Sequence, residues 1–190
     1  ATAISVGQQS ACALVADGKV RCWGRDAKWF EPCNGRAAVE VKGVTGATAV
    51  ATGPFQACAL TAGGGVACWV LCDQDKGCKS GAAGQVDTAP TAYVIKGLAK
   101  ATTLSADHDV CVAAGDHVLC TSTDGTGKKP TDTVVPEPVK QVASTGIKVC
   151  ARGDSGKVYC WGGRGTSDKP EAVAGVEGVV DLDADITGIC

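Results

Sequence analysis

Four pairs of cysteines recur along the chain at nearly the same spacing, and this repeat constrains the fold more than any other feature. The pairs are Cys12 with Cys22, Cys58 with Cys68, Cys111 with Cys120, and Cys150 with Cys160. Their first members lie 46, 53 and 39 residues apart. Self-similarity at a fixed period of about 20–50 residues indicates a repeat architecture.

Each cysteine pair is predicted to lie on a β-hairpin. Cross-strand partners in an antiparallel hairpin have position numbers with a constant sum. If Cys12 faces Cys22, the hairpin is therefore centred on residue 17, with a three-residue loop at residues 16–18. Glycine at the third position, Gly18, suits a type I turn followed by a bulge. The third repeat is one residue shorter, which centres a two-residue loop on Gly115 and Asp116, another favoured hairpin turn. The cysteines of every pair are therefore predicted to face each other within disulfide range.

The composition and the flanking segments favour further β-strands around each hairpin. The chain has 24 Val and 17 Thr against 7 Leu and 5 Ile, and β-branched side chains suit a pleated sheet. Apolar strands are predicted before three hairpins, at residues 3–6, 48–51 and 141–144. Closing strands are predicted at residues 38–43, 92–97, 134–139 and 171–175. Four strands per repeat are typical of a β-propeller blade.

Several of these stretches resemble the regulator of chromosome condensation (RCC1) type of propeller repeat, particularly its cysteine-rich secreted bacterial variety. The resemblance is carried by residues 4–7, 12–14, 17–24, 48–53, 58–60, 65–69 and 156–162. It implies an all-β, propeller-type array of about four blades with disulfide-stapled hairpins, and it implies protein binding rather than chemistry. We expect one RCC1-like repeat domain over 1–190, with repeats at 1–44, 45–98, 99–139 and 140–179 and a partial repeat at 180–190.

Four cysteines lie outside the hairpin pairs, at Cys33, Cys72, Cys78 and Cys190. Cys33 and Cys78 occupy equivalent loops, so a bond from Cys33 to Cys72 or to Cys78 and a local Cys72–Cys78 bond all stay open. Cys190 corresponds to Cys12 but has no second hairpin strand after it. The segment 180–190 is therefore expected to close a ring, to continue into a longer chain, or to be donated to a neighbouring subunit.

The cysteine content also predicts the compartment. Twelve cysteines without Cys-x-x-Cys pairs indicate disulfides, which persist outside the reducing cytosol. We therefore expect an extracellular or cell-surface location, or the periplasm, with any secretion signal already removed before Ala1. His108 and Cys111, like His117 and Cys120, have a spacing that resembles a zinc site, but residues three apart on a strand point to opposite faces. No cofactor is predicted.

Charge and motifs exclude several functional classes. The net charge of −2 is spread along the chain, whereas nucleic-acid binding needs a clustered basic face. The longest fully apolar stretch, 67–72, is too short to span a membrane. We find no catalytic motif and expect no enzymatic activity. Asp181, Asp183 and Asp185 form a weak calcium candidate, although alternating carboxylates also suit a solvated strand face.

The aromatic residues give the main functional expectation. Trp23, Trp69 and Trp161 each follow a hairpin cysteine and are predicted to pack between blades. Trp29 and Phe30 lie instead in the first loop after a hairpin, where large aromatic side chains suit partner binding. The sequence thus predicts a secreted, non-enzymatic module that binds another protein through loops on one face. The alternative is a subunit of an extracellular filament, a homopolymer assembled by strand donation and an intermolecular disulfide.

Overall fold

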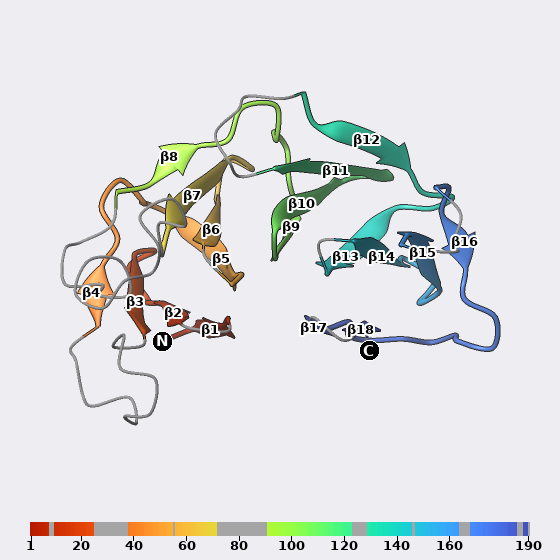
Figure 1. Cartoon of the computed structure of the whole chain (residues 1–190), viewed down its shortest axis with the longest axis horizontal. Coiled ribbons are helices and arrows are strands. Elements are labelled where there is room, and N and C mark those ends of the chain that lie inside the picture. Colours follow the sequence, from red (N-terminus) through yellow and green to blue (C-terminus); the bar gives the residue numbers. More distant parts are fainter. Residues whose placement is uncertain are drawn as a thin grey trace. The chain divides into compact units, whose positions relative to one another are not determined.

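The protein is described by a computed structural model, which consists of β-strands and their connections (Figure 1). It describes residues 1–7, 10–24, 38–54, 56–71, 91–122, 129–145, 147–163, 168–185 and 188–189. The chain forms two compact units, Ala1–Ile95 and Lys96–Cys190. Each unit contains two four-stranded antiparallel sheets in which the strands follow their order in the chain. We call each of these sheets a blade.

Unit 1 holds blades 1 and 2. Blade 1 consists of β1 (Ala3–Val6), β2 (Ser10–Leu14), β3 (Val20–Gly24) and β4 (Val39–Glu40). Blade 2 consists of β5 (Ala47–Thr52), β6 (Gln56–Thr61), β7 (Val66–Val70) and β8 (Tyr93–Val94).

Unit 2 holds blades 3 and 4 and a short hairpin. Blade 3 consists of β9 (Thr103–Ala106), β10 (Asp109–Ala114), β11 (His117–Ser122) and β12 (Thr131–Val134). Blade 4 consists of β13 (Val139–Ser144), β14 (Lys148–Gly153), β15 (Val158–Gly162) and β16 (Glu171–Ala172). The hairpin pairs β17 (Ala184–Asp185) with β18 (Gly188–Ile189). Over the described residues, no helix has the length and apolar character needed to cross a membrane.

The predicted fold class and its disulfide-stapled hairpins are confirmed. In each blade the two hairpin cysteines lie directly opposite each other in the strand register. All four pairs form disulfides, with Cα–Cα distances of 4.0–4.1 Å. Gly18 has the predicted left-handed conformation, with φ of 74°, and its N–H donates to the Val15 carbonyl. Gly115 and Asp116 form the predicted two-residue loop of the third hairpin, between Ala114 and His117.

One closing strand lies earlier than predicted. The pattern placed it at residues 134–139, whereas β12 ends at Val134 and Val139 begins β13. Pro136 and Pro138 explain the difference, because proline has no N–H to donate to a strand ladder. The Val139 N–H instead donates to the Gly115 carbonyl at 2.8 Å, which joins blade 3 to blade 4.

Side chains alternate along each strand, so every blade has two distinct faces. One face carries the disulfide, and the other carries the residue that follows the second cysteine; we call them the disulfide face and the tryptophan face. In unit 1 the disulfide face of blade 1 packs on the tryptophan face of blade 2, where Trp69 is fully buried. In unit 2 blade 3 packs in the same way on blade 4, around Trp161. These two tryptophans therefore lie between blades, as predicted.

Candidate functional site

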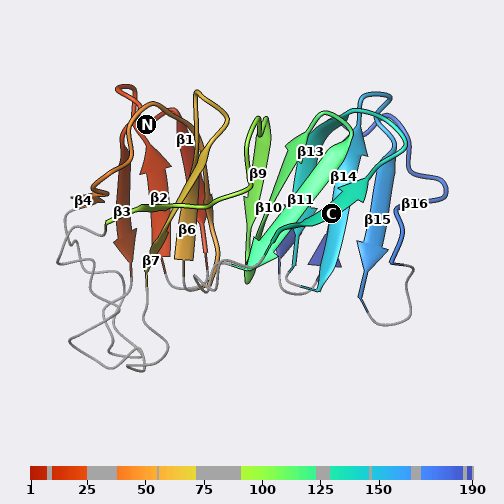
Figure 2. The same cartoon turned by 90° about the horizontal axis from the view of Figure 1, so that it is seen from above.

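The strand order gives every blade two ends with different properties. The hairpin turns between the second and third strands lie at one end, which we call the turn end. The connections between the first and second strands, and those that leave the third strand, lie at the opposite end, which we call the loop end. In Figure 2 the long strands of blades 1 and 2 run between these two ends of unit 1. The connections at the loop end differ in length and sequence between repeats, as is typical of surfaces that carry binding residues.

The predicted binding residues Trp29 and Phe30 fall outside the described residues, as do Cys33, Cys72, Cys78 and Cys190. Strand β3 ends with Gly24 at the loop end of blade 1. The role predicted for Trp29 and Phe30 stays a prediction.

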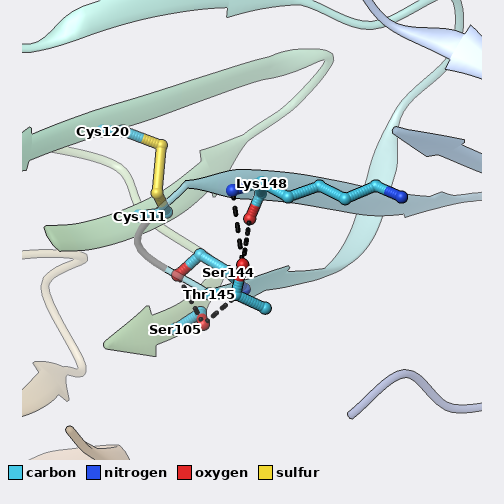
Figure 3. The surroundings of a disulfide bond; sticks show 6 residues. All are labelled: Ser105, Cys111, Cys120, Ser144, Thr145 and Lys148. Atoms are coloured by element: carbon cyan, nitrogen blue, oxygen red, sulfur yellow. Dashed lines mark hydrogen bonds between the residues drawn. A yellow bond between two sulfur atoms is a disulfide. The ribbon is translucent and has the colours of Figure 1, made fainter. Parts of the chain in front are cut away.

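The described part of the loop end displays an exposed apolar residue on blade 4. Ile147, which lies between β13 and β14, is 74% exposed. Its turn is held by hydrogen bonds from Thr145 N–H to the Lys148 carbonyl (3.0 Å) and from Lys148 N–H to Thr145 Oγ1 (3.3 Å; Figure 3). A Cβ atom at Gly162 would lie only 2.8 Å from the Ile147 carbonyl oxygen, so glycine is needed there. The chain thus presents Ile147 to solvent next to the hydrogen-bonded residues Thr145 and Lys148.

Serine hydroxyls join this turn to the neighbouring blade. Ser144 N–H donates to Ser105 Oγ at 3.0 Å, and the two hydroxyl oxygens lie 3.1 Å apart (Figure 3). Unit 1 has a similar link, in which Thr52 N–H donates to Ser5 Oγ at 2.9 Å. In both units the first strands of neighbouring blades are therefore tied together close to the loop end.

Ile147 is the functional candidate that sequence reasoning missed. It falls between two strands and has no place in the alternating pattern that identified the core. An isoleucine in a short connection between strands was the available signal. In unit 1, Val6 and Val70 at the loop ends of β1 and β7 are also exposed; Val6 had been assigned to the predicted strand 3–6, and Val70 follows the predicted hairpin segment.

The turn end of blade 4 carries a carboxylate bound by three donors. Glu137 Oε1 accepts hydrogen bonds from Ser155 Oγ (2.7 Å) and Tyr159 OH (2.9 Å), and Oε2 accepts one from Ser155 N–H (2.7 Å). These donors, those of Ser155 first, hold the pKa of Glu137 below its usual value. Burial and the neighbouring Glu137 carboxylate raise the pKa of Tyr159. All of these groups bind one another, so the cluster acts as a structural clamp on the linker between blades 3 and 4.

The histidine and aspartate candidates are also hydrogen-bonded within the chain. His117 Nδ1 lies 2.8 Å from Asp132 Oδ1, and this hydrogen bond raises the pKa of His117. Asp181 Oδ1 accepts from Gln141 Nε2 at 2.6 Å, and Asp183 Oδ1 accepts from the Ala184 N–H at 2.8 Å. No grouping of three or more His, Cys, Asp or Glu residues suited to a metal occurs in the part of the chain that the structure describes.

The comparisons with known proteins identify the class of fold. Residues 1–28 match the regulator of chromosome condensation (RCC1) repeat. The chain resembles the crystal structure of human WBSCR16, with a TM-score of 0.68 and 17% identity over 96% of this chain and 55% of that one. It also resembles Prp20p from Saccharomyces cerevisiae, with a TM-score of 0.64 and 14% identity over 93% and 52%. Yeast RCC1 (Prp20) with bound Kap60 gives 0.59 and 16% over 98% and 52%.

These findings confirm the resemblance to RCC1-type propeller repeats. The chain has the fold of RCC1-type blades, and its first blade contains a recognisable RCC1 repeat. It spans about half the length of the solved structures that it matches. No curated protein sequence matches it. The assignment to the cysteine-rich secreted bacterial variety of this repeat stays a prediction.

Proposed function

We propose that this chain is a non-enzymatic, extracellular or cell-surface module that binds another protein through the loop end of its blades. The observation that carries the proposal is Ile147, which is 74% exposed at the loop end of blade 4, where Thr145 and Lys148 are hydrogen-bonded to each other. Proteins of similar fold support the general idea of protein binding, because Prp20p is described with binding properties to Gsp1p and histones. Yeast RCC1 has likewise been crystallised with Kap60 bound.

The blade construction suits this task physically. A disulfide closes each hairpin, and hydrogen bonds tie each blade to its neighbour within a unit. A pre-organised surface loses less conformational entropy on binding, so more of the contact energy appears as affinity. Trp29, Phe30 and Ile147 would supply the apolar anchors, since large buried side chains dominate interface energetics.

The alternative function, a filament subunit that donates its last strand, would require existing contacts to be broken. Strand β17 pairs with β18 in the same chain, and Leu182 is buried beside Cys150 and Val158. Donation of this strand to a neighbour would therefore first have to free it from blade 4.

A matched pair of positions in unit 2 tests the binding proposal. Ile147 at the loop end and Val134 at the turn end are both exposed aliphatic residues, at 74% and 57%. A photo-crosslinking amino acid is placed at each position in turn, and the crosslinked proteins from the native source are identified by mass spectrometry. We expect a protein that crosslinks from position 147 and not from position 134.

Affinity measurements with the purified partner then decide the outcome. We expect Ile147→Asp to weaken binding by about tenfold or more, the effect of losing one interface anchor, and Val134→Asp to leave it unchanged. Equal crosslinking from both ends, or equal affinity of both variants, would contradict binding through the loop end.

A further inference from the structure

Two side-chain atoms in unit 1 are polar and buried, yet have no hydrogen-bond partner among the described residues. They are the indole nitrogen Nε1 of Trp69 and the hydroxyl oxygen Oγ of Ser10. Trp69 is fully buried, and its indole N–H can only donate a hydrogen bond. The described part of unit 2 has no buried side-chain nitrogen or oxygen in this condition. A buried polar group without a partner costs free energy, so these two atoms call for an explanation.

Both atoms belong to the joint between blades 1 and 2. Ser10 begins β2 two residues before Cys12, so the alternation of side chains places it on the disulfide face of blade 1. Trp69 lies on the tryptophan face of blade 2 and packs in one cluster with Cys12 and Cys22. Ser10 is at the loop end of β2, and Trp69 is the residue before the loop end of β7. The two side chains therefore face the same joint, in the half that is nearer the loop end.

The two blades approach each other closely in this half of the joint. Gly7 N–H donates to the Ser10 carbonyl at 2.8 Å, so Gly7 lies beside Ser10. A Cβ atom at Gly7 would overlap the Gly53 carbonyl oxygen of blade 2. Next to Gly53, the buried Thr52 donates its N–H to Ser5 Oγ at 2.9 Å. Because the backbones meet here, only a small molecule held inside the joint can reach the two unpartnered atoms.

The corresponding joint of unit 2 has a longer side chain at the position of Ser10. Ser10 and Asp109 each lie two positions before the first hairpin cysteine of their blade. Asp109 is therefore on the disulfide face of blade 3, which packs on the tryptophan face of blade 4 around Trp161, the equivalent of Trp69. An aspartate side chain is one bond longer than serine and offers two acceptor oxygens. Unit 1 thus combines the shorter side chain with a tryptophan N–H that lacks an acceptor.

We propose that the joint between blades 1 and 2 binds one buried water molecule between Trp69 Nε1 and Ser10 Oγ. Water can accept from the indole N–H and exchange a hydrogen bond with the hydroxyl, so one molecule satisfies both atoms. Buried water molecules in proteins make roughly 2–4 hydrogen bonds to polar groups of this kind. Serine with its water then takes the place that the Asp109 carboxylate has in unit 2. The water is a second polar link between these blades, beside the hydrogen bond from Thr52 to Ser5.

Hydration NMR of the wild-type chain, with its tryptophans labelled with nitrogen-15, tests the site directly. The nuclear Overhauser effect between water and an indole N–H proton has one sign for a water molecule that stays bound during molecular tumbling, and the other sign for a water molecule that exchanges rapidly. We expect the sign of a long-lived water molecule at Trp69. Trp23, which is half-buried, and Trp161, which faces the joint that contains Asp109, should not show it.

A pair of variants then identifies the second partner of the water. Ser10→Asp gives unit 1 the side chain that unit 2 has at this position, so it should displace the water and abolish the long-lived signal at Trp69. Ser5→Ala is the matched control, because it removes the other polar link of the same joint. We expect the signal at Trp69 to persist in this control.

Three results would overturn the proposal. The first is a wild-type Trp69 without a long-lived water signal, which would mean that another part of the chain binds its N–H. The second is a signal that Ser10→Asp leaves unchanged, and the third is a signal that Ser5→Ala and Ser10→Asp abolish alike, which would report only a loosened joint. The wild-type measurement decides the first point even if a variant fails to fold.

Discussion

The joints inside the two units share a backbone arrangement and differ in their side chains. Ala47 N–H donates to the Gly18 carbonyl at 2.9 Å in unit 1, and Val139 N–H donates to the Gly115 carbonyl at 2.8 Å in unit 2. Unit 2 adds the Glu137 carboxylate, bound by Ser155 and Tyr159. Unit 1 has no such clamp among its described residues.

Four positions change together between the two joints. Glu137, Gly153, Ser155 and Tyr159 of unit 2 correspond by register to Thr45, Thr61, Gly63 and Ala67 of unit 1. Glycine at position 153 leaves room for the Glu137 side chain, which a Cβ atom would overlap. The comparison teaches that the backbone arrangement of the joint is shared, whereas the side chains that reinforce it differ between the units.

The largest expected effect is on the apolar part of the unit 1 joint. Trp69→Ala should destabilise unit 1 by about 3–5 kcal/mol, because it removes a fully buried indole and leaves a cavity. Trp23→Ala is the matched control and should cost far less, since Trp23 is only half-buried. Hydrogen exchange of the β5–β7 amides measures both. Equal costs would show that burial between blades is not the source of the effect.

The disulfides should stabilise the two units alike. Replacing Cys58 and Cys68 by alanine removes the disulfide of blade 2, and replacing Cys150 and Cys160 removes that of blade 4. Both disulfides join cysteines 10 residues apart in the sequence. Each loss should cost about 2–4 kcal/mol if the chain-entropy account holds. Denaturant titrations of both double variants provide the measurement, and a clear inequality would point to a difference in how the two joints use their disulfides.

Acid should weaken the unit 2 joint and spare that of unit 1. The folded state lowers the pKa of Glu137 below 4.5, so the clamp contributes stability that is present above pH 4.5 and is lost as the pH falls through the lower, folded-state pKa. Hydrogen exchange of β13–β15 and β5–β7 at neutral and acid pH compares the units.

Two variants should remove this difference. Glu137→Gln abolishes the titrating group, and Gly153→Ala displaces the carboxylate from its donors. The interpretation fails if either variant retains the acid sensitivity of unit 2.

Within the clamp, the tyrosine hydroxyl should make a moderate contribution. Tyr159→Phe removes one hydrogen-bond donor to the Glu137 carboxylate and should destabilise unit 2 only modestly, because the carboxylate stays in contact with solvent. The pKa of Glu137 should rise at the same time, which NMR titration of the side-chain carboxyl can follow. An unchanged pKa would mean that the Ser155 hydrogen bonds alone hold the charge.

The smallest effect is expected on the surface of blade 3. The hydrogen bond to Asp132 raises the pKa of His117 above 6.5, so its contribution is fully present below pH 6.5 and is lost as the pH rises through the folded-state value. Asp132→Asn should return the pKa of His117 towards 6.5 in an NMR titration. The β11–β12 pairing should weaken only slightly, because both side chains are exposed.

The hairpins could be predicted from the sequence because their constraints are local. The two cysteines of each pair are 9 or 10 residues apart, and alternation along a strand leaves few registers that bring them together. Turn chemistry then specified the loop, as Gly18 and Gly115 show by their positive φ of 74° and 70°. The end of β12 was misplaced because the strand pattern was given more weight than Pro136 and Pro138.

The sequence by itself therefore determined the blades: their strands, turns, disulfides and the two faces of each sheet follow from steric rules that act over a few residues. Only the tertiary structure decided which faces are covered. Ile4 and Val142 have equivalent positions by strand register, yet Ile4 is 62% exposed and Val142 only 4%. Burial depends on what lies against a side chain, and that partner is distant in the sequence: Tyr159 binds Glu137 from 22 positions away, and Gln141 binds the Leu182 carbonyl from 41 positions away.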